Sequence, residues 1–175
     1  ILPNVVAPII VIASIGVVLA AMARDPAPPV DGVILVAPAV WGRATMDFGK
    51  RVALWVAVRT APWMTLTGRG LDITPSDNIE MLRKFSRDPL VIKETRVDAI
   101  WGLANLMDDA LDGARSFRAP ALILYGEKDD VIPKEPTRIM LERMPPVPPG
   151  TRRLAIYPSG FHMLMRDLQA EVVLG

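Results

Sequence analysis

Residues 5–23 carry no charged side chain, and this run constrains the fold more than any other part of the sequence. An uncharged run of about 20 residues is long enough to span a bilayer as one helix. The same run also divides into a β-branched strand at 8–12, a turn at 13–16 and a helix at 17–24, which the prolines at 26–29 would end. Because periodicity does not separate these two interpretations, the rest of the chain has to decide between them.

Three later segments have the composition of strands: residues 33–37, 120–125 and 152–157. The first two are short apolar runs bounded by glycine or proline, which is typical of central strands in a parallel sheet. Helices are expected at 135–144 and from about residue 162 onwards. Strands that alternate with helices indicate an α/β fold with a mostly parallel sheet.

Between the first two of these strands lies a long helical block, residues 41–118, in which we find no strand signal. Asp77, with Glu80 three positions later, predicts a capping box at the start of one helix. The sequence therefore predicts a core made of residues 1–40 and 119–175, with a helical cap inserted at 41–118 over the carboxyl edge of the sheet. Apolar residues mark the faces of two more cap helices, the first with Phe48, Val52, Leu54, Trp55, Val58 and Trp63, and the second, at helical spacing, with Ile100, Leu103, Ala104, Met107, Ala110 and Leu111.

Charge and composition exclude several classes of function. The 175 residues include 20 basic and 19 acidic side chains, so the chain lacks the basic excess of a nucleic-acid-binding protein. Zero cysteines exclude a disulfide scaffold, a thiol nucleophile and a thiolate metal site. A single histidine excludes metal centres that need several imidazoles, and we expect neither a metal nor a cofactor.

Three polar side chains follow predicted strands, in the loops where open α/β sheets place their sites: Ser14, Asp129 and His162. His162 is the only histidine, so it is the only imidazole available to move a proton near neutral pH. Asp129 is a candidate for orienting the imidazole, although its neighbours Asp130 and Glu127 carry the same chemistry. A structural histidine and a solvated acidic turn are the alternative interpretations.

The surroundings of Ser14 fit a catalytic serine poorly. A nucleophile elbow reads G-x-S-x-G, because small residues let a strand turn sharply into a helix. Here Gly16 is present, but Ile12 replaces the first glycine, and its β-branched side chain resists the tight turn. Ser14 is therefore either a nucleophile in an unusual elbow or a serine buried in an apolar helix.

Three segments carry a resemblance to a known family: residues 31–41, 122–129 and 160–168. They resemble bacterial lysophospholipases, which belong to the α/β-hydrolases of the monoacylglycerol lipase and serine aminopeptidase type. Residues 88–108 also resemble the helical cap of that family. The resemblance covers roughly residues 14–174 and implies a partial α/β-hydrolase fold with an inserted cap.

Carried over position by position, the resemblance assigns catalytic roles to four residues. His162 would be the general base, Asp129 its orienting acid and Ser14 the nucleophile. The backbone N–H of Ile15 would be one oxyanion donor. The implied activity is that of a serine hydrolase of carboxylic esters with lipid-like acyl substrates.

The resemblance also implies partners and a location. Trp41, Trp55 and Trp63 would line an apolar acyl pocket in the cap. The expected partners are a small lipid or ester substrate and, peripherally, a membrane surface, and the expected location is the cytoplasm. Two alternatives stay open, namely a non-catalytic domain of the same fold and a membrane protein anchored by residues 5–23.

Family members also have several strands and a His-Gly loop before the elbow, and this sequence contains neither. That loop supplies the second oxyanion donor, and loss of one donor costs about 10²–10³ in rate. We therefore expect this chain to correspond to the carboxyl-terminal part of such a hydrolase and to hydrolyse esters weakly.

Overall fold

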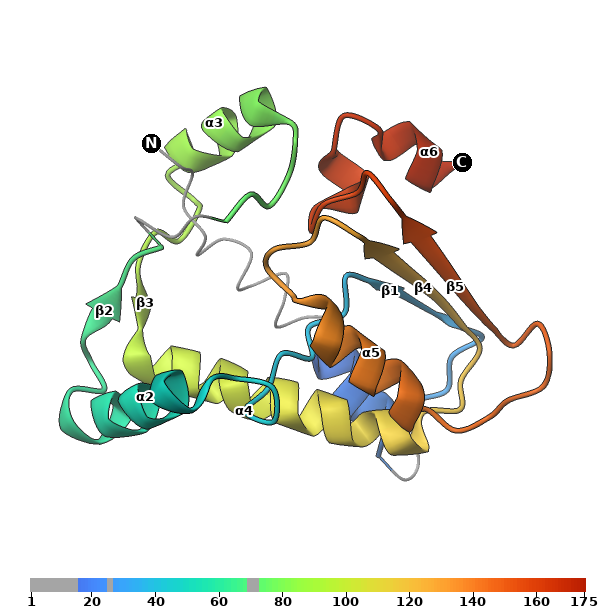
Figure 1. Ribbon diagram of the computed structural model, residues 1–175, viewed down its shortest axis with the longest axis horizontal. Coiled ribbons are helices and arrows are strands. Elements are labelled where there is room, and N and C mark those ends of the chain that lie inside the picture. Colours follow the sequence, from blue (N-terminus) through green and yellow to red (C-terminus); the bar gives the residue numbers. More distant parts are fainter. Residues whose placement is uncertain (1–15, 25–26, 69–72) are drawn as a thin grey trace.

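Three parallel strands form the central sheet of the computed structural model, which describes residues 16–24, 27–68 and 73–175. The strands are β1 (Val33–Val36), β4 (Ala121–Gly126) and β5 (Arg152–Tyr157), in the order β1-β4-β5 (Figure 1). Their parallel pairing confirms the predicted α/β fold. In the described part of the chain, however, β1 lies at an edge of the sheet and β4 lies at its centre.

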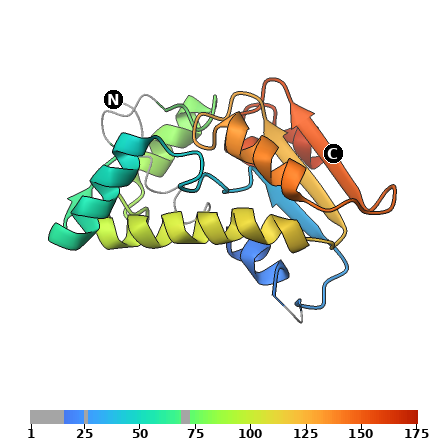
Figure 2. The ribbon, with the colours of Figure 1, turned by 60° about the horizontal axis from the view of Figure 1, so that its bottom comes forward.

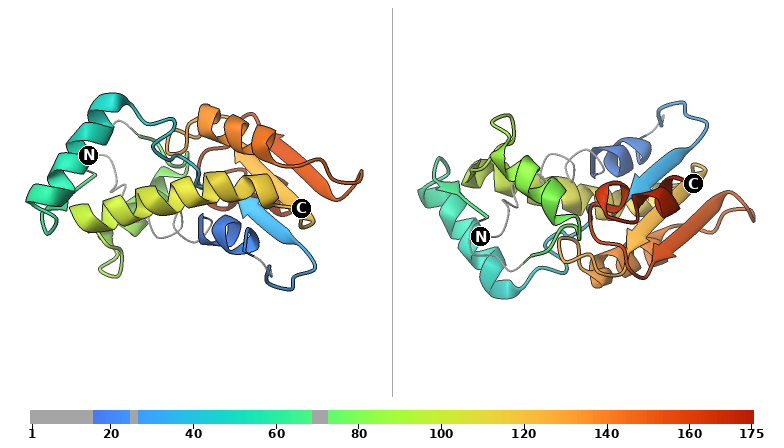
Figure 3. Two further views of the ribbon diagram at one scale, coloured as in Figure 1. Left: turned by 90° about the horizontal axis from the view of Figure 1, so that it is seen from below. Right: turned by 90° about the horizontal axis from the view of Figure 1, so that it is seen from above.

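One face of the sheet is covered by three helices. These are α4 (Val97–Gly113), α5 (Lys134–Arg143), which confirms the helix predicted at 135–144, and a helix over residues 16–22. Figures 2 and 3 show α4 running from α2 to the sheet, with α5 and the helix at 16–22 on either side of it. The helices and strands share one core cluster of buried residues, namely Leu19, Leu35, Val40, Ala110, Leu111, Ala114, Phe117, Ala121, Ile123, Met140 and Met144.

At β1 the opposite face of the sheet is the more open one. Successive residues of a strand point to opposite faces, so Ile34 points away from the face on which its buried neighbour Leu35 packs. Ile34 is 67% exposed, whereas Leu35 is 1% exposed. The apolar composition that predicted a central strand therefore covers both faces of β1, but within the described residues Leu35 is buried on one face while Ile34 is exposed on the other.

The uncharged run is only partly described. The helix at 16–22 confirms the predicted helix, and it buries Leu19 while Val17 is 52% exposed. The predicted strand at 8–12 and most of the predicted turn lie outside the described residues. Among the helices of residues 16–24, 27–68 and 73–175, none combines the length and the apolar character needed to cross a membrane.

The block after β1 contains α2 (Phe48–Thr60), α3 (Ile79–Arg87) and α4, followed by a 3₁₀ turn at Ala114–Ser116. It also contains a short antiparallel pair, β2 (Thr65–Leu66) and β3 (Thr95–Arg96), so the prediction of an all-helical block was wrong. Two-residue strands are too short to show an alternating pattern, which explains why they were missed. The division into a core and a cap at 41–118 stays a prediction.

The N-cap of helix α3 lies one residue after the predicted cap, Asp77. The N-cap is Asn78, whose side-chain oxygen accepts from the Met81 N–H at 3.1 Å. Asp77 does not cap the helix, because its carboxylate accepts from the distant Leu168 N–H at 2.8 Å. The capping-box prediction was therefore wrong in its residue, although the helix itself is confirmed.

The carboxyl-terminal segment also differs from its prediction. In place of a helix starting near His162, the chain forms a 3₁₀ turn at Leu164–Arg166 and then α6 (Ala170–Leu174). The Met163 N–H donates to the carbonyl of Pro75 at 2.9 Å, in the block before α3. The Met163 N–H therefore bonds to a distant segment and not within a continuous helix, and the helical structure here is short and interrupted.

Candidate active site

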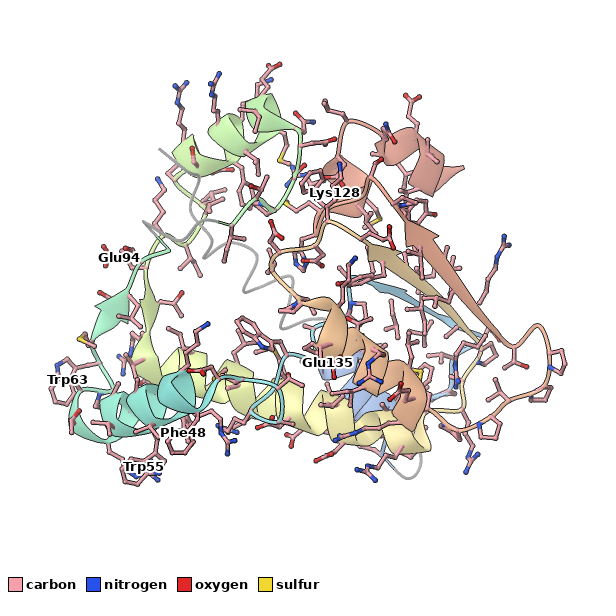
Figure 4. All side chains as sticks on the ribbon, viewed as in Figure 1. Phe48, Trp55, Trp63, Glu94, Lys128 and Glu135 are labelled. Carbon is pink, nitrogen blue, oxygen red and sulfur yellow. The ribbon has the colours of Figure 1, made fainter. Side chains whose placement is uncertain are left out.

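Two loops at the carboxyl edge of the sheet bring together Asp129 and His162. Asp129 follows β4, in the loop marked by Lys128 in Figure 4, and His162 follows β5. The His162 Nδ1 lies 2.9 Å from the Asp129 Oδ2, and each residue is only 5% exposed. The structure thus joins two of the three side chains that the sequence singled out.

Asp129 is held in place by its own loop. Its Oδ1 accepts from the backbone N–H groups of Val131 and Ile132, both at 2.8 Å. Its other oxygen is left for the imidazole. The neighbouring carboxylates of Glu127 and Asp130 are exposed, so of the three candidate acids only Asp129 contacts His162.

Two glycines allow the loops to approach closely. A Cβ on Gly126 would lie 2.5 Å from the carbonyl oxygen of Gly160, a distance that real Cβ atoms do not adopt. The Lys128 N–H donates to the same carbonyl at 2.9 Å. Any side chain at Gly126 would therefore push the loop that bears His162 away from the loop that bears Asp129.

Tyr125, on β4, is hydrogen-bonded to the loop that bears Asp129. Its hydroxyl donates to the carbonyl of Ile132 at 3.0 Å, and the ring is 5% exposed. Burial, and after it the nearby negative charge of Asp129, raises the pKa of Tyr125 to about 12. The phenol therefore stays neutral and keeps its donor over the whole physiological range.

Two further buried polar side chains lie in and beside the histidine loop, which we define as residues 158–168. The Ser76 hydroxyl donates to the Asp167 Oδ1 at 2.6 Å, and the other oxygen, Oδ2, accepts from the Phe161 N–H at 2.8 Å. No local sequence pattern marks Ser76 or Asp167. The one hint that the sequence offers is an aspartate five positions after the only histidine.

The remaining predicted site residues are not brought to this pair by the described structure. Ser14 and Ile15 lie outside the described residues. Trp41 packs on the cluster of Ala39, Met107, Val131 and Ile132, which includes the two residues that anchor Asp129. Trp55 and Trp63 are 49% and 66% exposed, and Figure 4 shows both at the outer surface near α2. An acyl pocket lined by the three tryptophans stays a prediction.

An aspartate–histidine pair on loops after adjacent parallel strands, with a largely helical insertion after the preceding strand, defines an α/β-hydrolase fold. Solved structures share this fold. The monoacylglycerol lipase of Paleococcus ferrophilus has a TM-score of 0.72 and 22% identity, over 90% of this chain and 61% of the lipase. A soluble variant of the monoglyceride lipase of Saccharomyces cerevisiae, in complex with a substrate analog, has a TM-score of 0.67 and 14% identity, over 91% of this chain and 58% of that chain.

A third example is an alpha/beta hydrolase enzyme from a Medee basin deep-sea metagenome library, with a TM-score of 0.51 and 13% identity, over 93% of this chain and 59% of that chain. The chain therefore spans about three fifths of the length of these structures. The family model described as serine aminopeptidase, S33, matches residues 4–169, and the chain belongs to this family. None of the curated proteins matches the sequence.

Proposed function

We propose that this chain supplies the base and the acid of a serine hydrolase that cleaves carboxylic esters of lipid-like acyl groups. The observation that carries the proposal is the buried contact between His162 and Asp129, at 2.9 Å, in a chain with no other histidine. A carboxylate on Nδ1 fixes the imidazole tautomer that leaves Nε2 free to accept a proton. This is the arrangement that nucleophilic ester hydrolysis needs.

In the proposed reaction the Ser14 hydroxyl attacks the ester carbonyl carbon, and the His162 Nε2 takes its proton. The anionic tetrahedral intermediate is stabilised by the Ile15 N–H. Its collapse breaks the ester bond, and His162 returns the proton to the leaving alcohol. Water then attacks the acyl-enzyme with His162 again as the base, which releases the acid and restores Ser14. The roles of Ser14 and Ile15 rest on the sequence resemblance.

The lipid-like substrate class is supported by the fold and by one side chain near the pair. Two structures of the same fold are described as monoacylglycerol and monoglyceride lipases. Trp41 packs on the cluster that contains Val131 and Ile132, the two residues whose N–H groups hold Asp129, and an apolar wall there would meet an acyl chain. A role of Trp55 and Trp63 in substrate binding stays a prediction from the sequence, and so does a cytoplasmic location.

Substitution at the pair tests the proposed reaction. In an assay of short and medium p-nitrophenyl esters, we expect Asp129→Asn to lower kcat by about 10⁴, because the amide favours the wrong imidazole tautomer. His162→Ala and Ser14→Ala should abolish turnover. Asp130→Asn is the matched control, since Asp130 is exposed and has no contact with His162. Full activity of His162→Ala would overturn the reaction class.

A non-catalytic domain of the same fold is the second candidate, favoured by Ile12 in place of the first elbow glycine. A fluorophosphonate probe separates the two functions, because it reacts only with an activated serine. Covalent labelling of the folded chain at Ser14 supports the hydrolase. A folded chain without an adduct supports the non-catalytic domain.

We also propose a peripheral membrane contact through α2, a 13-residue helix that buries no residue. Phe48, Val52, Trp55 and Val56 are spaced to share one helix face, and they are 75%, 43%, 49% and 43% exposed. The helix carries only basic charges, at Lys50, Arg51 and Arg59, and the Arg59 guanidinium lies 4.0 Å from the Trp55 ring centre. An exposed apolar face with basic neighbours is the composition that anionic bilayers attract.

Vesicle sedimentation tests this contact. We expect binding to vesicles with anionic lipid and weaker binding to vesicles of zwitterionic lipid alone. Phe48→Ala should weaken binding by about tenfold, the effect of withdrawing one large apolar side chain from the interface. Leu174→Ala is the matched control, because Leu174 is 66% exposed on α6, away from α2. Equal binding of both variants, or a concentration-dependent dimer of the free chain, would contradict a lipid partner.

A further inference from the structure

The backbone on both sides of His162 is held by hydrogen bonds from outside its own turn. The Phe161 N–H, one residue before, donates to the Asp167 Oδ2 at 2.8 Å. The Met163 N–H, one residue after, donates to the Pro75 carbonyl at 2.9 Å. The position of the histidine backbone therefore depends on Asp167 and on the segment that contains Pro75.

Asp167 connects these two supports. Its Oδ1 accepts from the Ser76 hydroxyl at 2.6 Å, and Ser76 directly follows Pro75. The Ser76 oxygen in turn accepts from the Asn78 N–H at 3.2 Å. Ser76 is 0% exposed and Asp167 is 6% exposed, so the hydrogen bond between them is shielded from water.

No cationic side chain of the described residues forms an ion pair with Asp167. A carboxylate in such a place is costly unless its oxygens are hydrogen-bonded. Both oxygens of Asp167 have donors, one from the histidine loop and one from Ser76. The carboxylate is thus placed where it can hold two segments at a fixed separation.

Two more hydrogen bonds join the same segments. The Leu168 N–H donates to the Asp77 Oδ1 at 2.8 Å, and the Asn78 Nδ2 donates to the Arg166 carbonyl at 3.2 Å. The helices that follow the segments, α3 and α6, lie at the end of the molecule opposite α4 (Figure 1). Residues 75–78 therefore form a support for the histidine loop that is built from a distant part of the chain.

We propose that Asp167 is a positioning residue for His162, acting through the Phe161 N–H, and that Ser76 fixes Asp167 to the 75–78 segment. Without the carboxylate, the Phe161 N–H loses its acceptor and the loop is free to move His162 away from Asp129. A displacement of about 1 Å at a catalytic group costs on the order of 10² in rate. The effect on turnover rests on the proposed hydrolase function, whereas the effect on the imidazole does not.

The single histidine gives a direct test, because every imidazole signal in an NMR spectrum of the chain belongs to His162. In the parent chain we expect a downfield, slowly exchanging Nδ1 proton, hydrogen-bonded to Asp129. Asp167→Ala should broaden or remove that signal while the chain stays folded. Asp167→Asn keeps one acceptor oxygen and should retain part of the signal, and Ser76→Ala should give an intermediate change. Glu171→Gln, an exposed acid on α6, should change nothing.

Kinetics on the same variants give the second measurement. We expect Asp167→Ala to lower kcat between about tenfold and a hundredfold, with KM changed by less than about twofold, since the substrate surface is untouched. A purely structural role would lower the melting temperature and leave the His162 proton signal and kcat as they are in the parent chain.

The outcomes separate this proposal from the proposed function. If the parent chain hydrolyses no ester, the hydrolase function fails, and the His162 proton signal still decides the role of Asp167. If Asp167→Ala does not fold, Ser76→Ala and Asp167→Asn decide it. An unchanged His162 signal in every folded variant would overturn the positioning role.

Discussion

The sequences of helices α2 and α4 have similar apolar patterns, but the apolar face of α4 is largely buried whereas that of α2 is largely exposed. Helix α4 buries six of its residues, Val97, Ala104, Met107, Ala110, Leu111 and Gly113, whereas α2 buries none. The two helices contact each other at the end of the molecule away from the sheet (Figure 2). Only α4 extends from there to the sheet, where its second half joins the core cluster. Helical periodicity therefore identifies an apolar face without saying what covers it.

The largest expected difference between the two helices is the cost of truncating an apolar side chain. Leu111 is 1% exposed on α4, and Val52 is 43% exposed on α2. We expect Leu111→Ala to lower the free energy of unfolding by about 2–5 kcal/mol, because it leaves a cavity in the core. Val52→Ala should change it by less than about 0.5 kcal/mol. Urea denaturation of both variants checks this, and a large loss at Val52 would show that α2 is covered in solution.

The next effect is a dependence of the free energy of unfolding on pH, which arises from Tyr125, a buried residue of β4. Because the pKa of Tyr125 in the fold is about 12, above its ordinary value of 10.0, the protonated phenol favours the folded state. This stability is fully present below pH 10 and is lost as the pH rises through 12, by about 2–3 kcal/mol in total.

We expect Tyr125→Phe to remove this alkaline loss, at the cost of about 1 kcal/mol for the bond to the Ile132 carbonyl. Urea denaturation at pH 9 and pH 11.5 measures both effects. Tyr157→Phe, at the other tyrosine of the chain, is the matched control and should keep the alkaline loss. An alkaline loss that persists unchanged in Tyr125→Phe would contradict the assignment.

The smallest effect compares two glycines within α4 itself. A Cβ on Gly113 would lie 2.8 Å from the Cβ of Ala23 and 3.3 Å from the Leu19 carbonyl oxygen, at the contact with the helix over residues 16–22. We expect Gly113→Ala to destabilise the fold by about 1–3 kcal/mol through overpacking. Gly102 has no atom within 4 Å of its added Cβ, so Gly102→Ala should stabilise it by about 0.5–1 kcal/mol. Melting temperatures that shift in the same direction would refute this comparison.

The parts of the fold that could be predicted are those with local signals. The apolar runs bounded by proline or glycine predicted β1 and β4, and the segment 152–157 coincides with β5. The single histidine and the acidic turn after β4 led to the pair that the structure joins at 2.9 Å. The chemistry of the turn left three neighbouring acids open, because the backbone course of the loop decides which carboxylate turns inward, and only the family resemblance selected Asp129.

The parts that were missed depend on contacts between distant residues. Asp77 and Asn78 both have the chemistry of an N-cap, and Asn78 takes that place because Leu168 occupies the Asp77 carboxylate. Ser76 and Asp167 gain their importance only from each other. Hydrogen bonds of this kind leave no periodic trace in either segment, so they become visible only in the folded chain.

The separation of Ser76 and Asp167 along the chain, 91 positions, also has a consequence for the order of folding. Contacts between distant residues form slowly, because the entropy of closing a long loop is lost before the contact stabilises the chain. Helices α3 and α4 lie within that loop and can form from local interactions beforehand. We therefore expect the support for His162 to assemble after these two helices, so that a refolding chain contains α3 and α4 before its histidine loop is held in place.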